Sequence, residues 1–393
     1  MAQDSEIAAK QQPPVNGSTK PAPGKAGLED VVAGTSQICY LDGKRGILAY
    51  RGYNINDLVK GEFEETAYLL FYGKLPNATE LAEFKKKLVA ARKLPQQIKD
   101  RIQQLPKNVH PMAVLRTIVS ELGLYDPTAE DMNVTANTEK GIRMLVQIPL
   151  VVAYYDAARN GRTVLESKDE LGHAANFLYL LLGKQQDERV VKMFDAALTL
   201  HADHELNAST FAGRVIAATL SDMYSAVVGA IGALKGPLHG GANEQVMRML
   251  LKINDPNNAK SWITDALARK EKIMGFGHRV YRTEDPRATH LRKFSEEMGQ
   301  RTGQPQWYQI SRTVEDFIKQ EKGLYANVDF YSASTYHLMG IPLDLYTPIF
   351  AMSRVSGWVA HILEQYSNNR LIRPTAEYIG QIDQEYTPLE KRK

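Results

Sequence analysis

Apolar residues recur at intervals of three and four along most of this chain, the spacing of one face of an α-helix. After Asn77, for example, Leu81, Phe84 and Leu88 share one face. Asn77 and Glu80 are spaced like the residues of a capping box and predict a helix start near residue 78. Strands do not alternate with these helices, so a mainly α fold is expected. The same pattern predicts further helices over about 240–253, 258–274, 286–299, 311–322, 330–339 and 348–367.

The longest apolar run, from Ser209 to Leu234, predicts a single buried helix. At about 1.5 Å of rise per residue, such a helix would span about 39 Å. Arg214 and Asp222 interrupt the run, and charges near the centre of a bilayer are costly, so a core helix is favoured over a membrane span. The helix should end before Gly236-Pro237, because proline cannot continue it.

The start of the chain has a different pattern. Residues 1–27 are rich in Pro, Gly, Gln, Lys and Ser and lack the apolar core of a secretory signal, so we expect a disordered tail. The segment TSQICYLDGKRGILAYRG predicts a small β-hairpin, in which Asp42-Gly43 supplies residues suited to positive φ in a tight turn. A length of 393 residues favours two or three domains, or one large fold with a lobe.

Composition excludes some classes of function. The net charge of +3 is small against 48 basic and 45 acidic residues. Basic residues form only local groups such as 85–87, so nothing indicates a nucleic-acid surface. The single cysteine, Cys39, allows no disulfide within the chain, which fits a reducing compartment, and we expect a cytoplasmic protein.

The segment GFGHRVYRTEDPR, residues 275–287, carries the most concentrated chemistry. It combines a glycine-flanked histidine, His278, with three arginines, which suits a site that moves a proton and holds an anion. Its glycines free backbone N–H groups for a ligand, although the third glycine and preceding strand of a dinucleotide fingerprint are missing. Asp285-Pro286 predicts a helix start, with Arg287 either extended into solvent or bound to an anion. Taken alone, the segment could equally be a structural turn.

Two further segments carry candidate groups. His239 in GPLHGGAN lies between two predicted helices, where a positive helix end favours the neutral imidazole. Asp329 in NVDFYS could be a helix cap or a carboxylate base. The helix end would lower the pKa of Asp329, and water-excluding neighbours would raise it. His239 could also be an ordinary loop histidine.

His201 and His204 in HADHE stand three residues apart, a spacing that suits a metal if both lie on one helix face. No third ligand is obvious, so we expect no metal site and interpret one histidine as a substrate group supported by the other. Arg354 lies in an apolar predicted helix, where an unpaired charge is costly. Arg373 is less distinctive on its own. The GxSxG, P-loop and CxxC patterns are missing from the sequence.

Together, these segments resemble those of the citrate synthase family over about residues 28–390. GFGHRVYRTEDPR, GPLHGGAN and NVDFYS match the three catalytic segments of that family in order. The resemblance implies a two-domain, mainly helical homodimer with a small N-terminal hairpin. Residues 28–240 plus 341–393 would form the large domain and 241–340 the small one, with the active site in the cleft between them.

The resemblance implies condensation of acetyl-CoA with oxaloacetate and water to give citrate and CoA, the first step of the tricarboxylic acid cycle. Asp329 would remove a methyl proton, His239 would stabilise the enol or enolate, and His278 would protonate the oxaloacetate carbonyl. Acetyl-CoA is a co-substrate, and neither a cofactor nor a metal is implied. The implied substrate-binding residues are His204, Arg287, Arg354 and Arg373, the last from the partner subunit. The implied CoA-binding residues are Ile273, Met274, Gly275, Phe276, Gly277 and Arg282.

Two alternatives stay open. A 2-methylcitrate synthase uses propionyl-CoA and shares these residues, and one methylene in an apolar pocket is worth only about 1–3 kcal/mol. A catalytically inactive helical scaffold that binds CoA or acidic metabolites is the alternative from another class.

Overall fold

The computed structural model describes residues 26–28 and 31–392, so nearly all of the predicted tail lies outside the described residues. The chain divides into two compact units. One comprises Met1–Thr35 with Arg373–Lys393 and contains the short 3-10 helices η1 (Ala26–Leu28) and η4 (Leu389–Lys391). The other comprises Ser36–Ile372 and contains all elements described below. The predicted division into a large and a small domain stays a prediction.

The predicted hairpin is confirmed, and a third strand extends it into a small antiparallel sheet in the order β1-β2-β3. Its strands are β1 (Cys39–Asp42), β2 (Ile47–Tyr50) and β3 (Tyr53–Asn54). The Asp42 carboxylate accepts the N–H groups of Lys44 and Arg45 and so shapes the turn. The left-handed glycine of this turn is Gly46, with φ of 65°, and not Gly43 as we expected.

The first helices cover the segment that follows the sheet. The capping box of Asn77 and Glu80 is confirmed, because each side chain accepts a hydrogen bond from the other residue's backbone N–H. The helices of this segment are α1 (Ile55–Leu58), α2 (Phe63–Tyr72), α3 (Ala78–Ala91), α4 (Gln96–Gln104), α5 (Pro111–Leu124), α6 (Val134–Arg159), α7 (His173–Leu182) and α8 (Glu188–His201).

The single long helix predicted after Ser209 was wrong. The run contains two helices, α9 (Ala208–Ala217) and α10 (Met223–Leu234), which pack against each other. Leu220 takes a left-handed φ of 64° between them, and Asp222 caps α10 by accepting the N–H of Ser225. Apolar content alone predicted one continuous helix, but Asp222 starts a second helix by capping its N-terminus.

The remaining helices include the elements that carry the candidate site. They are α11 (Ala242–Ile253), α12 (Ala259–Ala268), α13 (Pro286–Thr302), α14 (Gln306–Lys322), α15 (Val328–Leu338) and α16 (Tyr346–Ser367), with 3-10 turns η2 (Pro256–Asn258) and η3 (Leu343–Leu345). Helix α12 ends at residue 268, not near 274 as predicted, because the exposed charged run 269–272 has no apolar face to bury and Lys270 takes a φ of 59°.

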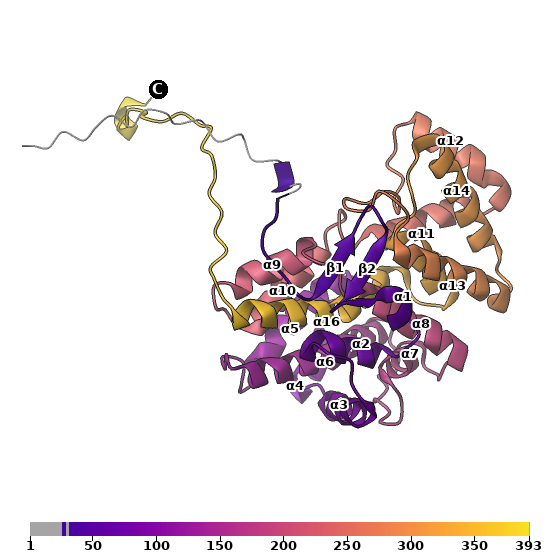
Figure 1. Cartoon of the computed structure of the whole chain (residues 1–393), viewed down its shortest axis with the longest axis horizontal. Helices are drawn as coiled ribbons and strands as arrows, with labels where there is room; N and C mark the ends of the chain where they lie inside the picture. The colour runs from indigo at the N-terminus through magenta and orange to yellow at the C-terminus, as the bar shows by residue number, and fades with distance from the viewer. Residues whose placement is uncertain (1–25, 29–30, 393) are drawn as a thin grey trace, which may run out of the picture. The chain divides into compact units, whose positions relative to one another are not determined.

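Helix α16 is buried along nearly its whole length and packs against α2, α6, α8, α9 and α10 (Figure 1). Helices α11 to α15 form a second group of mutually packed helices, most of them coloured orange or salmon in Figure 1. The mainly α fold is thereby confirmed. Among the described residues, no helix is both long and apolar enough to cross a membrane.

At Gly357, helix α16 lies close against the segment that follows α8. Its N–H donates to the carbonyl of Ala202 at 3.1 Å. A Cβ here would lie 3.0 Å from the Cβ of Asp203 and closer still to two oxygen atoms of this segment. The segment leads directly into His204, so this contact sets where that histidine lies.

We expect Gly357→Ala to destabilise the fold by about 1–3 kcal/mol, because overpacking would push α16 away from Ala202. The control is Gly232→Ala on α10, where an added Cβ meets nothing within 4 Å. This control should gain up to about 1 kcal/mol from helix propensity. Chemical denaturation of both variants measures the difference, and equal stability of the two would contradict the prediction.

Candidate active site

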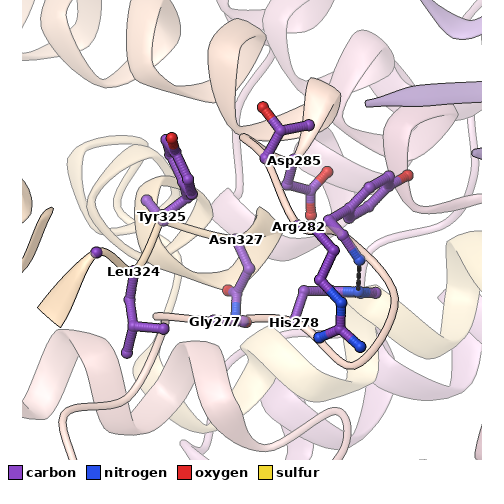
Figure 2. Close-up of a pocket in the computed structure, with 11 residues that line it drawn as sticks. Gly277, His278, Arg282, Asp285, Leu324, Tyr325 and Asn327 are labelled. Atoms are coloured by element: carbon purple, nitrogen blue, oxygen red, sulfur yellow. Dashed lines mark hydrogen bonds between the residues drawn. The ribbon is translucent and has the colours of Figure 1, made fainter. Parts of the chain in front are cut away.

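The loop around Gly275 and Gly277 is held by the chain segment before α15. Both glycines have left-handed φ, of 84° and 73°. The Gly277 N–H donates to the carbonyl of Tyr325, and the Asn327 side chain donates to the carbonyl of Gly277 at 3.0 Å. Figure 2 shows these two segments side by side around a pocket of about 170 Å³. The pocket is also lined by His278 and Arg282.

His278 is fixed by the turn that follows it. Its Nδ1 accepts the N–H of Val280 at 3.0 Å and that of Tyr281 at 3.2 Å. Burial, together with the positive charge of Arg287, lowers the pKa of His278 to about 4. The ring is therefore neutral at pH 7, and since Nδ1 accepts, its proton lies on Nε2. Such a ring can donate a hydrogen bond without carrying a charge.

His239 lies between α10 and α11, as predicted. Its Nε2 lies 2.9 Å from the hydroxyl of Ser209 and accepts the backbone N–H of that residue at 3.4 Å. Burial, and then the positive charge of Arg354, lowers the pKa of His239 to about 4. A backbone N–H can only donate, so these contacts assign the proton of the neutral ring to Nδ1.

His204 lies beside His278, with their ring centroids 5.0 Å apart. Burial, and then Arg287, lowers the pKa of His204 well below its ordinary value. Its Nε2 lies 3.3 Å from the hydroxyl of Tyr281. His201 and His204 do not share a helix face, because α8 ends at His201. Within the described part of the chain, no group of three His, Cys, Asp or Glu side chains is arranged to hold a metal.

Asp329 lies in the first turn of α15 and Asn327 is the N-cap, so of the two interpretations left open by the sequence the helix cap is wrong. The carboxyl is buried, and its Oδ1 has no hydrogen-bond partner among the described residues. Of the two opposing influences left open by the sequence, burial dominates. It raises the pKa of Asp329 to about 7, even though Arg287 acts in the opposite direction.

Asp285 caps α13 and Pro286 follows it at the first helical position, as predicted. Arg287 does not extend into solvent, and the anion that it binds in the structure is a carboxylate of the chain itself, Asp285. It is buried, and its Nε and Nη2 donate to the two oxygens of Asp285 at 2.9 and 2.8 Å. Asp285 also accepts the N–H of Val328 at 3.1 Å and so joins the starts of α13 and α15.

Arg354 completes the cluster from α16. It is buried, donates to the carbonyl of His201 at 2.7 Å, and lies 4.7 Å above the ring of Phe350. The charge of Arg354 influences the pKa of His204, His239 and Asp329. The charge of Arg287 likewise influences His204, His278 and Asp329. The three catalytic candidates therefore lie around two arginines in one buried region.

The other candidates fall outside this buried cluster or at its edge. Ile273, Met274 and Phe276 are partly buried against the core, and Arg282 lines the pocket. Arg373 is exposed and belongs to the unit formed by the two chain ends. Sequence reasoning missed Ser209, the partner of His239, and gave Asp285 only a capping role. Ser209 is 30 positions from His239, and Asp285 is 43 positions from Val328, so no local sequence pattern connects either pair.

This chain is similar to known proteins along most of its length. Residues 27–375 match the family described as "Citrate synthase, C-terminal domain". Citrate synthase 2 of Bacillus subtilis is 52% identical over 368 residues, which cover 93% of this chain and 98% of that protein. A 2-methylcitrate synthase of Shewanella oneidensis is 42% identical over 369 residues, covering 93% and 98%. A solved ternary complex of carboxymethyl coenzyme A and oxaloacetate with citrate synthase from Thermoplasma acidophilum has a TM-score of 0.89 at 35% identity, covering 93% and 98%.

The raised pKa of Asp329 predicts a pH-dependent cost to stability. An acid whose pKa is higher in the folded protein stabilises it at low pH and loses that contribution as the pH rises through the folded value, here about 7. Asp329→Asn removes the charge, so it should stabilise the protein relative to wild type by about 2.5 kcal/mol more at pH 8 than at pH 5. Chemical denaturation of both proteins at the two pH values measures this, and a pH-independent difference would contradict it.

Proposed function

The chain belongs to the citrate synthase family, and we propose that it condenses acetyl-CoA with oxaloacetate and water to give citrate and CoA, an acyltransferase reaction. The observation that carries the proposal is the site's combination of one buried carboxyl with a raised pKa and two neutral histidines. A carbon–carbon bond formed through an enol needs a base of this kind and hydrogen-bond donors for two oxygens.

Asp329 is the proposed base. A thioester methyl is a very weak acid, so its proton moves only to a base whose pKa is high enough to hold it and low enough to be ionised near neutrality. The pKa of about 7 meets both requirements. Asp329 takes the proton from the methyl carbon of acetyl-CoA, and the electron pair of that C–H bond moves into the enolate.

His239 and His278 are the proposed hydrogen-bond donors. His239 would donate from Nδ1 to the thioester oxygen as negative charge develops there, since its Nε2 is occupied by Ser209. His278 would donate from Nε2 to the ketone oxygen of oxaloacetate, since its Nδ1 is occupied by the turn. The enol carbon attacks the ketone carbon, and the oxygen receives its proton from His278. Water then cleaves citryl-CoA.

Oxaloacetate is a dianion, and we assign its carboxylates to His204, Arg287 and Arg354. Asp285 occupies Nε and Nη2 of Arg287, which leaves Nη1 for a carboxylate. Both guanidiniums are buried, so an anion that reaches them meets little competing water. Lysine at either position would lose the planar geometry that binds two oxygens at once.

CoA is assigned to the segment 273–277 and to Arg282. The left-handed glycines open the backbone of this segment, and the adjoining pocket is lined by Arg282, which can pair with a phosphate. The relative from Thermoplasma acidophilum was solved with a CoA derivative and oxaloacetate, which supports the pairing of these two substrates.

We further propose that the protein works as a cytoplasmic homodimer in which Arg373 completes the partner's site. The chain has one cysteine and so cannot form an internal disulfide, which supports a location in the reducing cytoplasm. The proposed steps use side chains alone, so we propose that no cofactor or metal takes part and that a chelator leaves turnover unchanged.

Turnover of oxaloacetate with acetyl-CoA, followed through the free thiol of CoA, tests the proposed function. We expect kcat/KM to be higher with acetyl-CoA than with propionyl-CoA. Because a 2-methylcitrate synthase is also similar to this chain, propionyl-CoA is the informative competitor. A clear preference for propionyl-CoA would identify the protein as a 2-methylcitrate synthase. One methylene typically changes kcat/KM by about 10- to 200-fold, so both substrates have to be measured side by side.

The control for this experiment is Asp329→Asn, which keeps the shape of the side chain and removes the base. Its turnover should fall by at least about 100-fold, the usual contribution of a general base, while oxaloacetate still binds. Unchanged turnover would contradict the role of Asp329. Absence of turnover in wild type, with substrate binding retained, would instead indicate an inactive scaffold.

Subunit mixing tests the role of Arg373. Arg354→Ala and Arg373→Ala should each be nearly inactive alone. If Arg373 acts across the interface, a hybrid dimer contains one intact site, so random co-assembly should restore about a quarter of wild-type activity. A fully active monomer, or hybrid dimers without any recovered activity, would contradict the proposal.

A further inference from the structure

The tip of the β1–β2 hairpin lies directly against the loop that carries His278. The Arg282 N–H donates to the carbonyl of Gly43 at 2.8 Å, although the two residues are far apart in sequence. At the other side of the tip, a Cβ on Gly46 would lie 3.0 Å from Thr283 and 3.2 Å from the carbonyl of Glu284. The hairpin thus covers the backbone that follows His278.

The base of the same hairpin is fixed to the segment that carries His204. The hydroxyl of Tyr50, at the end of β2, donates to the carbonyl of Asp203 at 2.9 Å. The Asp203 N–H donates back to that hydroxyl at 3.3 Å. Tyr50 is fully buried, so its contact with Asp203 is a firm anchor. The hairpin therefore spans from one histidine-bearing segment to the other.

Gly43 is required here by space and not by backbone conformation. Its φ is not left-handed, so another residue could adopt it. A Cβ on Gly43, however, would lie 2.7 Å from the carbonyl carbon of Val280 and nearer still to its oxygen. Both atoms belong to the backbone and cannot rotate away. Val280 is also one of the two residues whose N–H groups hold Nδ1 of His278.

We propose that the β1–β2 hairpin is a positioning element for His278 and that Gly43 is its positioning residue. The hairpin tip packs against the carbonyl of Val280 and accepts the N–H of Arg282. These contacts fix the turn whose Val280 and Tyr281 N–H groups donate to Nδ1 of His278. That arrangement keeps the proton of His278 on Nε2, where it faces the ketone. The inference rests on the proposed function for its catalytic consequence, but the orientation of His278 can be measured separately.

Gly43→Ala is the decisive variant. It should lower kcat/KM by about 10- to 100-fold, the usual effect of misplacing a reacting group by about an ångström. The control is Gly34→Ala, where an added Cβ meets nothing within 4 Å and turnover should be unchanged. Asp42→Ala is the second variant, because it removes the two turn hydrogen bonds of Asp42 without adding an atom and should lower kcat/KM by a smaller factor.

The orientation of His278 is read independently of turnover from the imidazole ¹⁵N shifts of histidine-labelled protein, assigned by comparison with His278→Asn. Wild type should show the Nε2–H form, and Gly43→Ala should show a mixture of the two tautomers. If both hairpin variants fold but keep wild-type shifts and kcat/KM, the inference is wrong. If wild type lacks condensation activity, the proposed function fails, and the ¹⁵N shifts alone decide the role of the hairpin.

Discussion

The buried ion pair between Asp285 and Arg287 is the interaction on which the candidate site depends. One carboxylate accepts three N–H groups of Arg287 and the first N–H of α15. Removing either charge would leave the other buried and uncompensated, which typically costs about 3–5 kcal/mol. The pair therefore fixes the starts of α13 and α15 together. Arg287, proposed to bind oxaloacetate, and Asp329, proposed to take the methyl proton of acetyl-CoA, share this single anchor.

Burial shifts the pKa of the carboxyl group and of the two histidines in opposite directions, and both shifts suit the proposed reaction. It raises the pKa of Asp329 and lowers that of His239 and His278, since each group resists the form that carries charge. The two arginines remain charged, because even the lowered pKa of Arg354 is about 10. Both guanidiniums can therefore offer positive charge to the carboxylates of the proposed dianionic substrate.

Much of the fold followed from local patterns. Cap residues, hairpin composition and apolar spacing predicted the hairpin and most helices, and the three candidate catalytic segments could be picked out from the sequence. The errors arose where a distant contact or a local signal opposed the main pattern. Asp222 could have marked the break between α9 and α10, because aspartate is a strong N-cap. The partner of Arg287, Asp285, is only two positions away in sequence, yet its importance depends on its contact with Val328, 43 positions further along the chain. The pKa of Asp329 depends on burial, which only the assembled fold determines.

The turn between α9 and α10 has a consequence for how the length of this chain can vary. By folding the apolar run back on itself, it brings Ser209, at the start of one helix, beside His239, just after the other. Leu220 in that turn is exposed, and surface turns usually tolerate inserted or deleted residues. An inserted residue that lengthens α10 itself would rotate the positions beyond it by roughly 100° about the helix axis and carry His239 away from its partner, so any change in length has to stay within the turn. A solvent-exposed turn with no chemistry of its own therefore sets how two helices bring together residues of the candidate site.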